Sequence, residues 1–397
     1  MARMRVPAGL LVVSLLAWAG VASAQNVTTG AEGLSIKGFI SGSLFLQNQN
    51  FTFGNGQNAE FPIPPQSKTD RWFLDGDVRN TRLTLAFNGP KQENDTKIGA
   101  TVEADFFGGF NGTGGFSNAQ ATPRLRLAFV DLVRGKTTFR VGQGWAPLFG
   151  NVPVSYSHLA FPLGYGATGN IGWRFPGVFI YRDLTSAGSK VSTKFTFAAM
   201  RNAWAGPGNN VDSGSAGPAS TLPQLEGRLD WSGKTGGGGA WSSYVVGHWD
   251  KKDLSGVGAK TANDSLTGWA GEVGLKLTSG PVMIQGNAYT GKAIGQHFGQ
   301  ISQFGDIKSW GVWGQAGYNF TKRWSGYLFY GIETPNKKDV LAANATRVKN
   351  QMFAPSLMYN LGPYGFNVEW MRDKLTTGAA ETTTNGDQFA ASVIYKF

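Results

Sequence analysis

The chain has 397 residues, of which only 15% are charged and 13% are aromatic, with 57 glycines and a formal net charge of +11. A soluble chain of this length typically forms two or three domains and carries about 25% charged residues. The absence of cysteine excludes a disulfide framework and any thiolate metal site or nucleophile, and a mean hydropathy of −0.19 is too polar for a bundle of membrane-spanning helices.

The first segment, residues 1–24, has the composition of a secretory signal peptide. Arg3 and Arg5 provide a positive start, residues 10–21 are apolar, and the Ala-Ser-Ala at 22–24 matches the small-residue cleavage pattern. The apolar stretch is too short for a membrane-spanning helix. We expect cleavage directly after this tripeptide, which leaves a mature chain of 373 residues with a net charge of +9.

The mature chain repeats one pattern, in which apolar residues occupy every second position. It is clearest at 389–397, FAASVIYKF, where the odd-numbered residues form one face. A strict period of two is the signature of a β-strand. A chain that ends in such a strand, on a terminal Phe, resembles the closing strand of bacterial outer-membrane barrels. Sixteen segments follow the pattern: 36–47, 77–88, 96–106, 124–133, 136–145, 170–182, 190–201, 223–231, 240–249, 266–278, 282–291, 307–320, 323–333, 347–359, 364–372 and 388–397.

The lengths of the connections between these segments also indicate a barrel. Odd-numbered connections are expected to be long, at 48–76, 107–122, 146–169, 202–222, 250–265, 292–306, 334–346 and 373–387. Even-numbered connections are expected to be short turns, at 89–95, 134–135, 183–189, 232–239, 279–281, 321–322 and 360–363. Long external loops that alternate with tight periplasmic turns are typical of membrane barrels. We therefore predict an all-β fold: one transmembrane antiparallel barrel of 16 strands, formed by residues 25–397 and embedded in the outer-membrane lipid of a Gram-negative cell.

Apolar side chains on one face of each strand are expected to contact lipid. Because hydrocarbon offers no partner for backbone N–H and C=O groups, the sheet must close on itself. The clearest outward faces are Leu83/Leu85/Phe87, Trp269/Val273/Leu275/Leu277 and Tyr364/Phe366/Val368/Trp370. Aromatic residues near strand ends fit the interfacial girdles of a barrel, and these are Trp145, Trp249, Trp310, Trp324 and Tyr359.

The opposite face of the strands carries charged side chains in the first half of the chain. These candidate pore-lining residues occupy five successive strands and are Arg82, Glu103, Asp105, Arg124, Arg126, Arg140 and Arg174. Neighbouring strands lie about 4.8 Å apart, so the arginines would form a basic patch on one wall of the lumen. The two acids would pair with arginines and hold the guanidinium groups in place. An alternative is that these charges only satisfy one another in a filled interior.

The third external connection, residues 146–169, has an unusual composition. It contains no Asp, Glu, Lys or Arg and is rich in Pro, Gly and aromatic residues. A long apolar loop is unfavourable in water, so we expect it to fold into the lumen and narrow the channel.

Two adjacent runs carry a resemblance to a known family. PRLRLAFVD at 123–131 and TFRVGQGWAP at 138–147, together with the strand order and the long third loop, resemble trimeric sixteen-strand porins, and most of all the DcaP-like porins. The resemblance implies a homotrimer in which the inward third loop forms a constriction opposite a basic wall. Carried over to this chain, the arginines named above would line that constriction. Since general porins often carry acids on this loop and this sequence has none, the departure favours anions.

The sequence therefore predicts a porin for ion and solute transport, without enzymatic activity or cofactor. Small hydrophilic solutes would diffuse passively, with a preference for anions such as carboxylates, because fixed positive charge at a constriction attracts anions and disfavours cations. Alternatives are a substrate-specific channel, a barrel hydrolase using Ser155 or Ser157 beside His158, and a soluble exported carbohydrate-binding protein. Nucleic acid is not an expected partner, because the basic residues are spread over lumen and turns.

No metal site is indicated by the spacing of possible ligands. The three histidines, His158, His248 and His297, have no second histidine or carboxylate at metal-ligand spacing. A calcium site formed by loop acids such as Asp250 or Asp264 is a further alternative, but no motif supports it.

Overall fold

The structure is a computed structural model that describes residues 32–397 apart from 53–55, 64–71, 109–120, 163, 166, 203–215, 255–264, 296, 298 and 303–304. The predicted signal peptide and Asp264 lie outside the described residues. The strands are β1 (Gly33–Gln47), β2 (Phe73–Asp77), β3 (Arg82–Lys91), β4 (Lys97–Asp105), β5 (Arg124–Arg134), β6 (Thr137–Trp145), β7 (Arg174–Asp183), β8 (Val191–Met200), β9 (Gln224–Lys234), β10 (Ala240–Asp253), β11 (Ser265–Ser279), β12 (Val282–Lys292), β13 (Lys308–Asn319), β14 (Trp324–Pro335), β15 (Arg347–Leu361), β16 (Tyr364–Thr377) and β17 (Thr382–Lys396).

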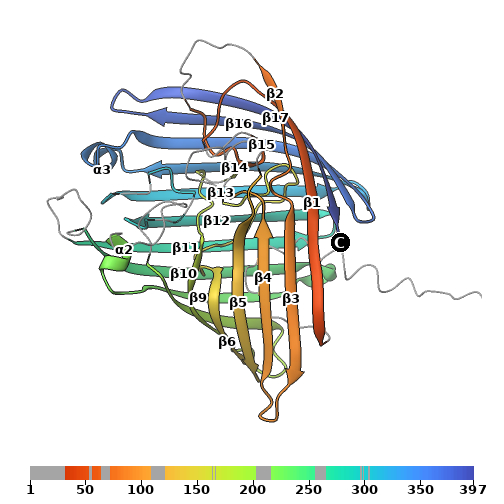
Figure 1. Cartoon of the computed structure of the whole chain (residues 1–397). Coiled ribbons are helices and arrows are strands. Elements are labelled where there is room, and N and C mark those ends of the chain that lie inside the picture. The colour runs from red at the N-terminus through yellow and green to blue at the C-terminus, as the bar shows by residue number, and fades with distance from the viewer. Residues whose placement is uncertain are drawn as a thin grey trace, which may run out of the picture.

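The strands form one closed antiparallel barrel. From β3 to β17 each strand pairs with its neighbour in sequence, and β1 pairs with β17 from Phe39↔Lys396 to Gln47↔Gln388. Figure 1 shows the first and last strands side by side. Closure removes the open edge that hydrocarbon would not tolerate, so the predicted barrel is confirmed.

The barrel has sixteen strand positions because β2 and β3 share one. Both pair with β1, β2 opposite Ser43–Gln47 and β3 opposite Gly33–Phe39. The segment between them, residues 78–81, leaves the ladder, and Arg79 and Asn80 in it are buried. The continuous strand expected at 77–88 is therefore interrupted.

The helices in the described residues are short and lie in the connections. They are the 3-10 helices η1 (Gly56–Asn58) and η2 (Gly236–Gly238) and the α-helices α2 (Ala216–Ala219) and α3 (Lys337–Ala342). The side chain of Asn336 caps α3 by accepting a hydrogen bond from the Asp339 amide at 3.1 Å. None of the helices in the described part of the chain has the length and apolar character needed to cross a membrane.

The alternation of burial along each strand follows the predicted period. β12 and β13 are nearly perfect examples, with exposed and buried residues in turn. The exposed parity carries large apolar side chains, among them Leu85, Val273 and Val368. This is the outward face expected to contact lipid.

Most of the aromatic residues predicted for the girdle lie on the exposed side of the barrel. Trp249, Trp310 and Trp324 are exposed, and Tyr359 packs on Trp324 with ring centroids 4.8 Å apart. Trp145 differs, because its ring stacks on Phe149 at 3.9 Å. It therefore supports the start of the third connection instead of the girdle.

The last connection is shorter than the sequence indicated. The long loop expected at 373–387 is a turn at 378–381, because β16 and β17 continue through paired threonines, Thr376↔Thr383 and Thr377↔Thr382. Threonine is β-branched and favours extended backbone, and the polar character of this stretch masked that preference.

Candidate functional site

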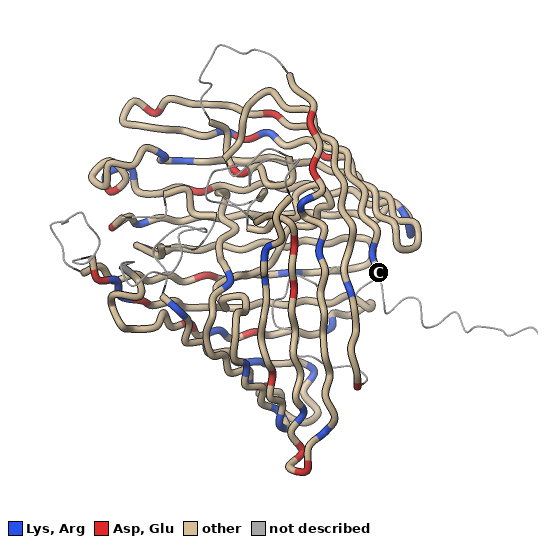
Figure 2. Tube along the Cα trace, viewed as in Figure 1, with Lys and Arg blue, Asp and Glu red and all other residues tan. Residues whose placement is uncertain are grey.

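The candidate site begins with two acids and two arginines on neighbouring strands. From β5, Arg124 donates to both Asp105 oxygens, Nε to Oδ1 at 2.9 Å and Nη2 to Oδ2 at 2.6 Å. Arg126 bridges both acids of β4, with Nε 2.7 Å from Glu103 Oε1 and Nη1 2.9 Å from Asp105 Oδ2. Two-pronged bonds of this kind fix the guanidinium planes. Figure 2 shows the basic and acidic positions side by side on these strands.

Two further arginines predicted from the sequence, Arg82 and Arg174, lie beside this network. Arg82 lies 3.9 Å from Glu103 and donates to the Leu159 carbonyl at 3.3 Å. Arg174, the first residue of β7, lies over the rings of Trp145 and Trp173. It forms no ion pair among the described residues.

Arg79 is an arginine that the sequence pattern did not indicate. It lies in the break at 78–81, bonds to Asp77 at 2.8 Å and stacks over Phe107, which also lies under Arg124. We call Arg79, Arg82, Arg124, Arg126 and Arg174, with Asp77, Glu103 and Asp105, the arginine cluster. Five arginines against three acids give it a formal charge of +2.

Arg140 lies apart from the arginine cluster. Its Nε and Nη2 bond to Asp131 at 2.7 and 2.8 Å, and its guanidinium sits 3.5 Å from the Phe129 ring centroid. A register shift opposite Glu103 and Ala104 explains this arrangement. The bulge changes the parity of β5, so that Phe129 and Asp131 face the same way as the arginines before it.

The third connection is hydrogen-bonded to strands β9 and β13 of the barrel. At its start, the Leu148 amide donates to Glu226 of β9 at 2.7 Å, and Arg228 donates to the Pro147 carbonyl at 2.9 Å. Further along, the Val154 amide donates to Gln315 of β13 at 2.7 Å. Glu226, Arg228 and Gln315 all lie at the alternate strand positions that are buried.

A second group of contacts holds residues 155–165. Ser155 Oγ and the Tyr165 hydroxyl each donate to Glu369 Oε2 of β16 at 2.9 Å. Burial, followed by the charge of this carboxylate, raises the pKa of Tyr165 well above its usual value, so the phenol keeps the proton that it donates. Ser157 accepts from Asn367 at 2.7 Å.

Glycines on the wall make room for this segment. A side chain added at Gly365 would come within 2.4 Å of the Tyr156 ring, and one at Gly331 within 2.4 Å of the Thr168 carbonyl oxygen. Both glycines lie on the buried parity of their strands. The close approach of this segment to β14 and β16 therefore depends on positions without a side chain.

The serines and histidine of this segment do not have the geometry of a catalytic triad. In a triad the serine hydroxyl contacts His Nε2 while the acid contacts Nδ1. Here Nδ1 of His158 contacts Glu369, but Nε2 faces Gln388 Oε1 at 2.9 Å and Ser155 Oγ contacts the acid itself. The hydrolase alternative therefore has no assembled nucleophile at Ser155.

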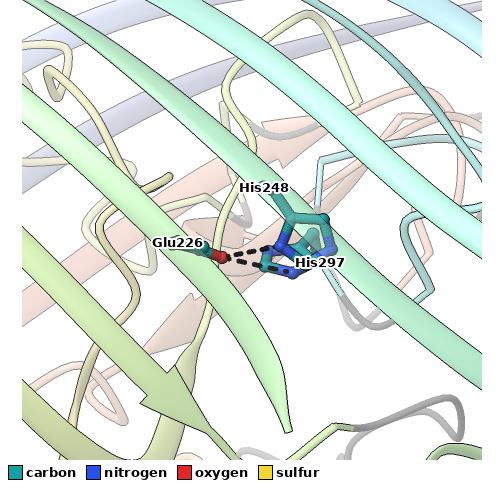
Figure 3. A group of neighbouring side chains, drawn as sticks. All are labelled: Glu226, His248 and His297. Carbon is teal, nitrogen blue, oxygen red and sulfur yellow. Dashed lines mark hydrogen bonds and ion pairs between the residues drawn. The ribbon is translucent and has the colours of Figure 1, made fainter. Parts of the chain in front are cut away.

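The other two histidines meet at a separate place. Figure 3 shows His248 of β10 and His297 of the connection 293–307 beside Glu226 of β9. Spacing along the chain gave no indication of this group, because its members come from three elements. Asp250, considered as a loop acid for calcium, lies instead in β10, buried and bonded to Lys252 at 2.5 Å.

A buried acid in the first connection gives a pH prediction. Burial raises the pKa of Glu60 to about 8, against an opposing attraction from Arg347, and its Oε2 has no hydrogen-bond partner among the described residues. At a pH between the ordinary pKa of glutamate and about 8, Glu60 is protonated in the folded chain and ionised in the unfolded chain. Its contribution to the free energy of unfolding is therefore fully present below the ordinary pKa and is lost as the pH rises through 8.

We therefore expect the unfolding temperature of the barrel, read from heat-modifiable gel mobility, to fall from pH 6 to pH 9. The fall should be roughly a few degrees smaller in Glu60→Gln. Glu93→Gln, which changes an exposed turn acid, is the matched control and should behave as the wild type. Equal pH dependence in all three proteins would contradict the assignment.

Comparison with known proteins identifies the fold. No family model matches the chain, and neither does any curated protein sequence. Among solved structures, the outer membrane channel DcaP of Acinetobacter baumannii matches with a TM-score of 0.70 at 18% identity, over 93% of this chain and all of that one. An anion-selective porin from Comamonas acidovorans matches with 0.56 at 15% identity, over 92% and 99% of the two chains. OmpF of Salmonella typhi, solved with daunomycin, matches with 0.56 at 12% identity, over 92% and 97%.

The chain thus has the fold of sixteen-strand outer-membrane porins. At these identities the likeness concerns architecture, and the strand count, closure and apolar outer face agree with it. A closed barrel of this type implies a location in the outer membrane of a Gram-negative cell.

Proposed function

We propose that this chain is a porin whose water-filled channel passes small hydrophilic solutes by passive diffusion and prefers anions, carboxylates among them. The observation that carries the proposal is the arginine cluster, with its formal charge of +2. The likeness to the anion-selective porin from Comamonas acidovorans supports the same preference for anions. The hydrolase alternative finds no support in the geometry around Ser155.

The second part of the proposal concerns the constriction. Residues 146–169 carry no charged side chain and bond to the buried parity of strands from β9 to β17. Arg82 reaches the Leu159 carbonyl from the other side. We propose that this segment lies in the lumen opposite the arginine cluster, so that a passing solute meets positive charge on one side and uncharged groups on the other.

Assembly and export complete the proposal. We propose that residues 1–24 are removed on export and that residues 25–397 form a barrel that associates as a homotrimer. An apolar hollow on the outer face, over β1, β2 and β15–β17, supports a contact between subunits and is lined by Leu44, Leu46, Leu74, Leu357, Val368 and Phe389. A mass three times that of the chain in detergent, and an N-terminus at Gln25, are the expected measurements.

Reconstitution into a planar bilayer tests the channel. We expect stepwise conductance and, in a potassium chloride gradient, a reversal potential displaced toward the equilibrium potential of chloride. A fixed positive charge at the constriction gives that sign. A cation-selective reversal potential would overturn the anion preference, and the absence of conductance steps would overturn the channel itself.

A further inference from the structure

The histidines away from the proposed constriction form a compact group with one acid. Nδ1 of His248 lies 3.0 Å and Nε2 of His297 lies 3.8 Å from Glu226 Oε1. One atom from each residue can be chosen so that all three lie within 4.8 Å of one another. Around a tetrahedral ion with bonds of about 2.0–2.1 Å, ligand atoms are about 3.3 Å apart, so modest side-chain rotation brings the three into range.

Hydrogen bonds among the described residues do not explain why the His297 side chain is buried here. Its side chain is fully buried, yet neither ring nitrogen has a hydrogen-bond partner among the described residues. A buried polar group left without a partner costs about 1–3 kcal/mol. The ring stands edge-on to His248 at 4.8 Å and beside Phe175 at 5.2 Å. An ion between Glu226 and the two rings would satisfy it.

The surroundings hold the other two residues in place for the same ion. One carboxylate oxygen of Glu226, Oε2, accepts a hydrogen bond from the Leu148 amide at 2.7 Å. The other oxygen, Oε1, is therefore the one turned toward the histidines. If His248 binds through Nδ1, its Nε2 points to Asp250 Oδ2 at 3.4 Å. Metal-binding histidines usually have their second nitrogen oriented by a carboxylate in this way.

We propose that Glu226, His248 and His297 bind a divalent transition-metal ion of the zinc type. Two imidazoles and one carboxylate suit zinc, whereas calcium prefers oxygen ligands throughout. Because all three side chains are fully buried, the ion is structural. It joins β9, β10 and the connection 293–307, and through Leu148 it stabilises the start of the third connection. This inference is independent of the direction of the channel's selectivity.

The test uses full-length, tag-free protein refolded in detergent without metal and then titrated with Zn²⁺ or Co²⁺. We expect one tightly bound ion per chain, the visible absorption bands of tetrahedral Co²⁺, and a higher unfolding temperature with Zn²⁺. His297→Gln should weaken binding by more than about a hundredfold. Asp250→Asn, which keeps all three ligands, should weaken it by about 10–100-fold.

His158→Gln is the matched control for metal binding, since it removes the third buried histidine and should retain the ion. Heat-modifiable mobility confirms that each variant has folded, and the Zn²⁺ and Co²⁺ titrations of the wild type decide the matter if neither variant folds. Absence of stoichiometric ion in the wild type overturns the proposal. Equal affinity of the wild type, His297→Gln and Asp250→Asn also overturns it.

Discussion

Replacing Arg82 and Arg174 together by glutamine is expected to abolish most of the anion preference of the channel. The change takes the arginine cluster from a formal charge of +2 to zero. A guanidinium at about 8 Å from a passing anion contributes roughly 2 kcal/mol at an effective dielectric of about 20, and salt reduces this further. The permeability ratio of chloride to potassium should therefore fall several-fold, toward one.

These two arginines are chosen because their removal leaves the other pairs intact. Arg124 and Arg126 are bonded to buried acids, and removing one partner of a buried ion pair typically costs about 3–5 kcal/mol. Their replacement would confuse selectivity with folding. Arg82 has a 3.9 Å ion pair with Glu103 and a 3.3 Å hydrogen bond to the Leu159 carbonyl, and Arg174 has no ion pair among the described residues.

The measurement is the reversal potential of single channels in a potassium chloride gradient. Arg323→Gln, which removes a positive charge from a short turn far along the chain from the cluster, is the matched control and should keep the wild-type value. An unchanged ratio in the double variant would show that the cluster does not face the permeation path.

The fold was accessible from the sequence because a membrane barrel imposes simple rules on it. Each strand must alternate between lipid and interior, and external loops are long where periplasmic turns are short. The sixteen predicted segments overlap the sixteen strand positions, and outward residues such as Leu85 and Val273 are exposed as expected. Alternation fails where backbone geometry departs from the ideal, and no residue type marks the bulge in β5 or the break that carries Arg79.

The site was less accessible, because its contacts join residues that are distant in the chain. Strict alternation predicts Arg140 beside the other arginines, but the bulge turns Asp131 of β5 toward Arg140, and the two side chains pair. Likewise, His248 and His297 lie on different elements and meet only when the connection 293–307 packs against the wall. A search for metal spacing along the chain examines neighbours in sequence and therefore misses such a group.

The anchoring of the third connection gives the second large effect. Glu369 accepts hydrogen bonds from Ser155 and Tyr165 at 2.9 Å and contacts Nδ1 of His158. Glu369→Ala would leave three buried polar groups without this partner, at about 1–3 kcal/mol each. We expect the segment to detach from β16, the single-channel conductance to rise and fluctuate more, and larger neutral sugars to enter liposomes faster.

Conductance and liposome swelling measure the two consequences separately. Glu369→Gln should give an intermediate conductance, because its one acceptor oxygen can still accept from both hydroxyl groups while the amide replaces the acceptor that faces His158. Glu381→Gln alters an exposed acid in the turn at 378–381 and should match the wild type. If Glu369→Ala folds, as judged by heat-modifiable mobility, and conducts as the wild type does, then residues 146–169 do not set the width of the channel. The anion preference would then have to come from the arginine cluster alone, without an opposing uncharged wall.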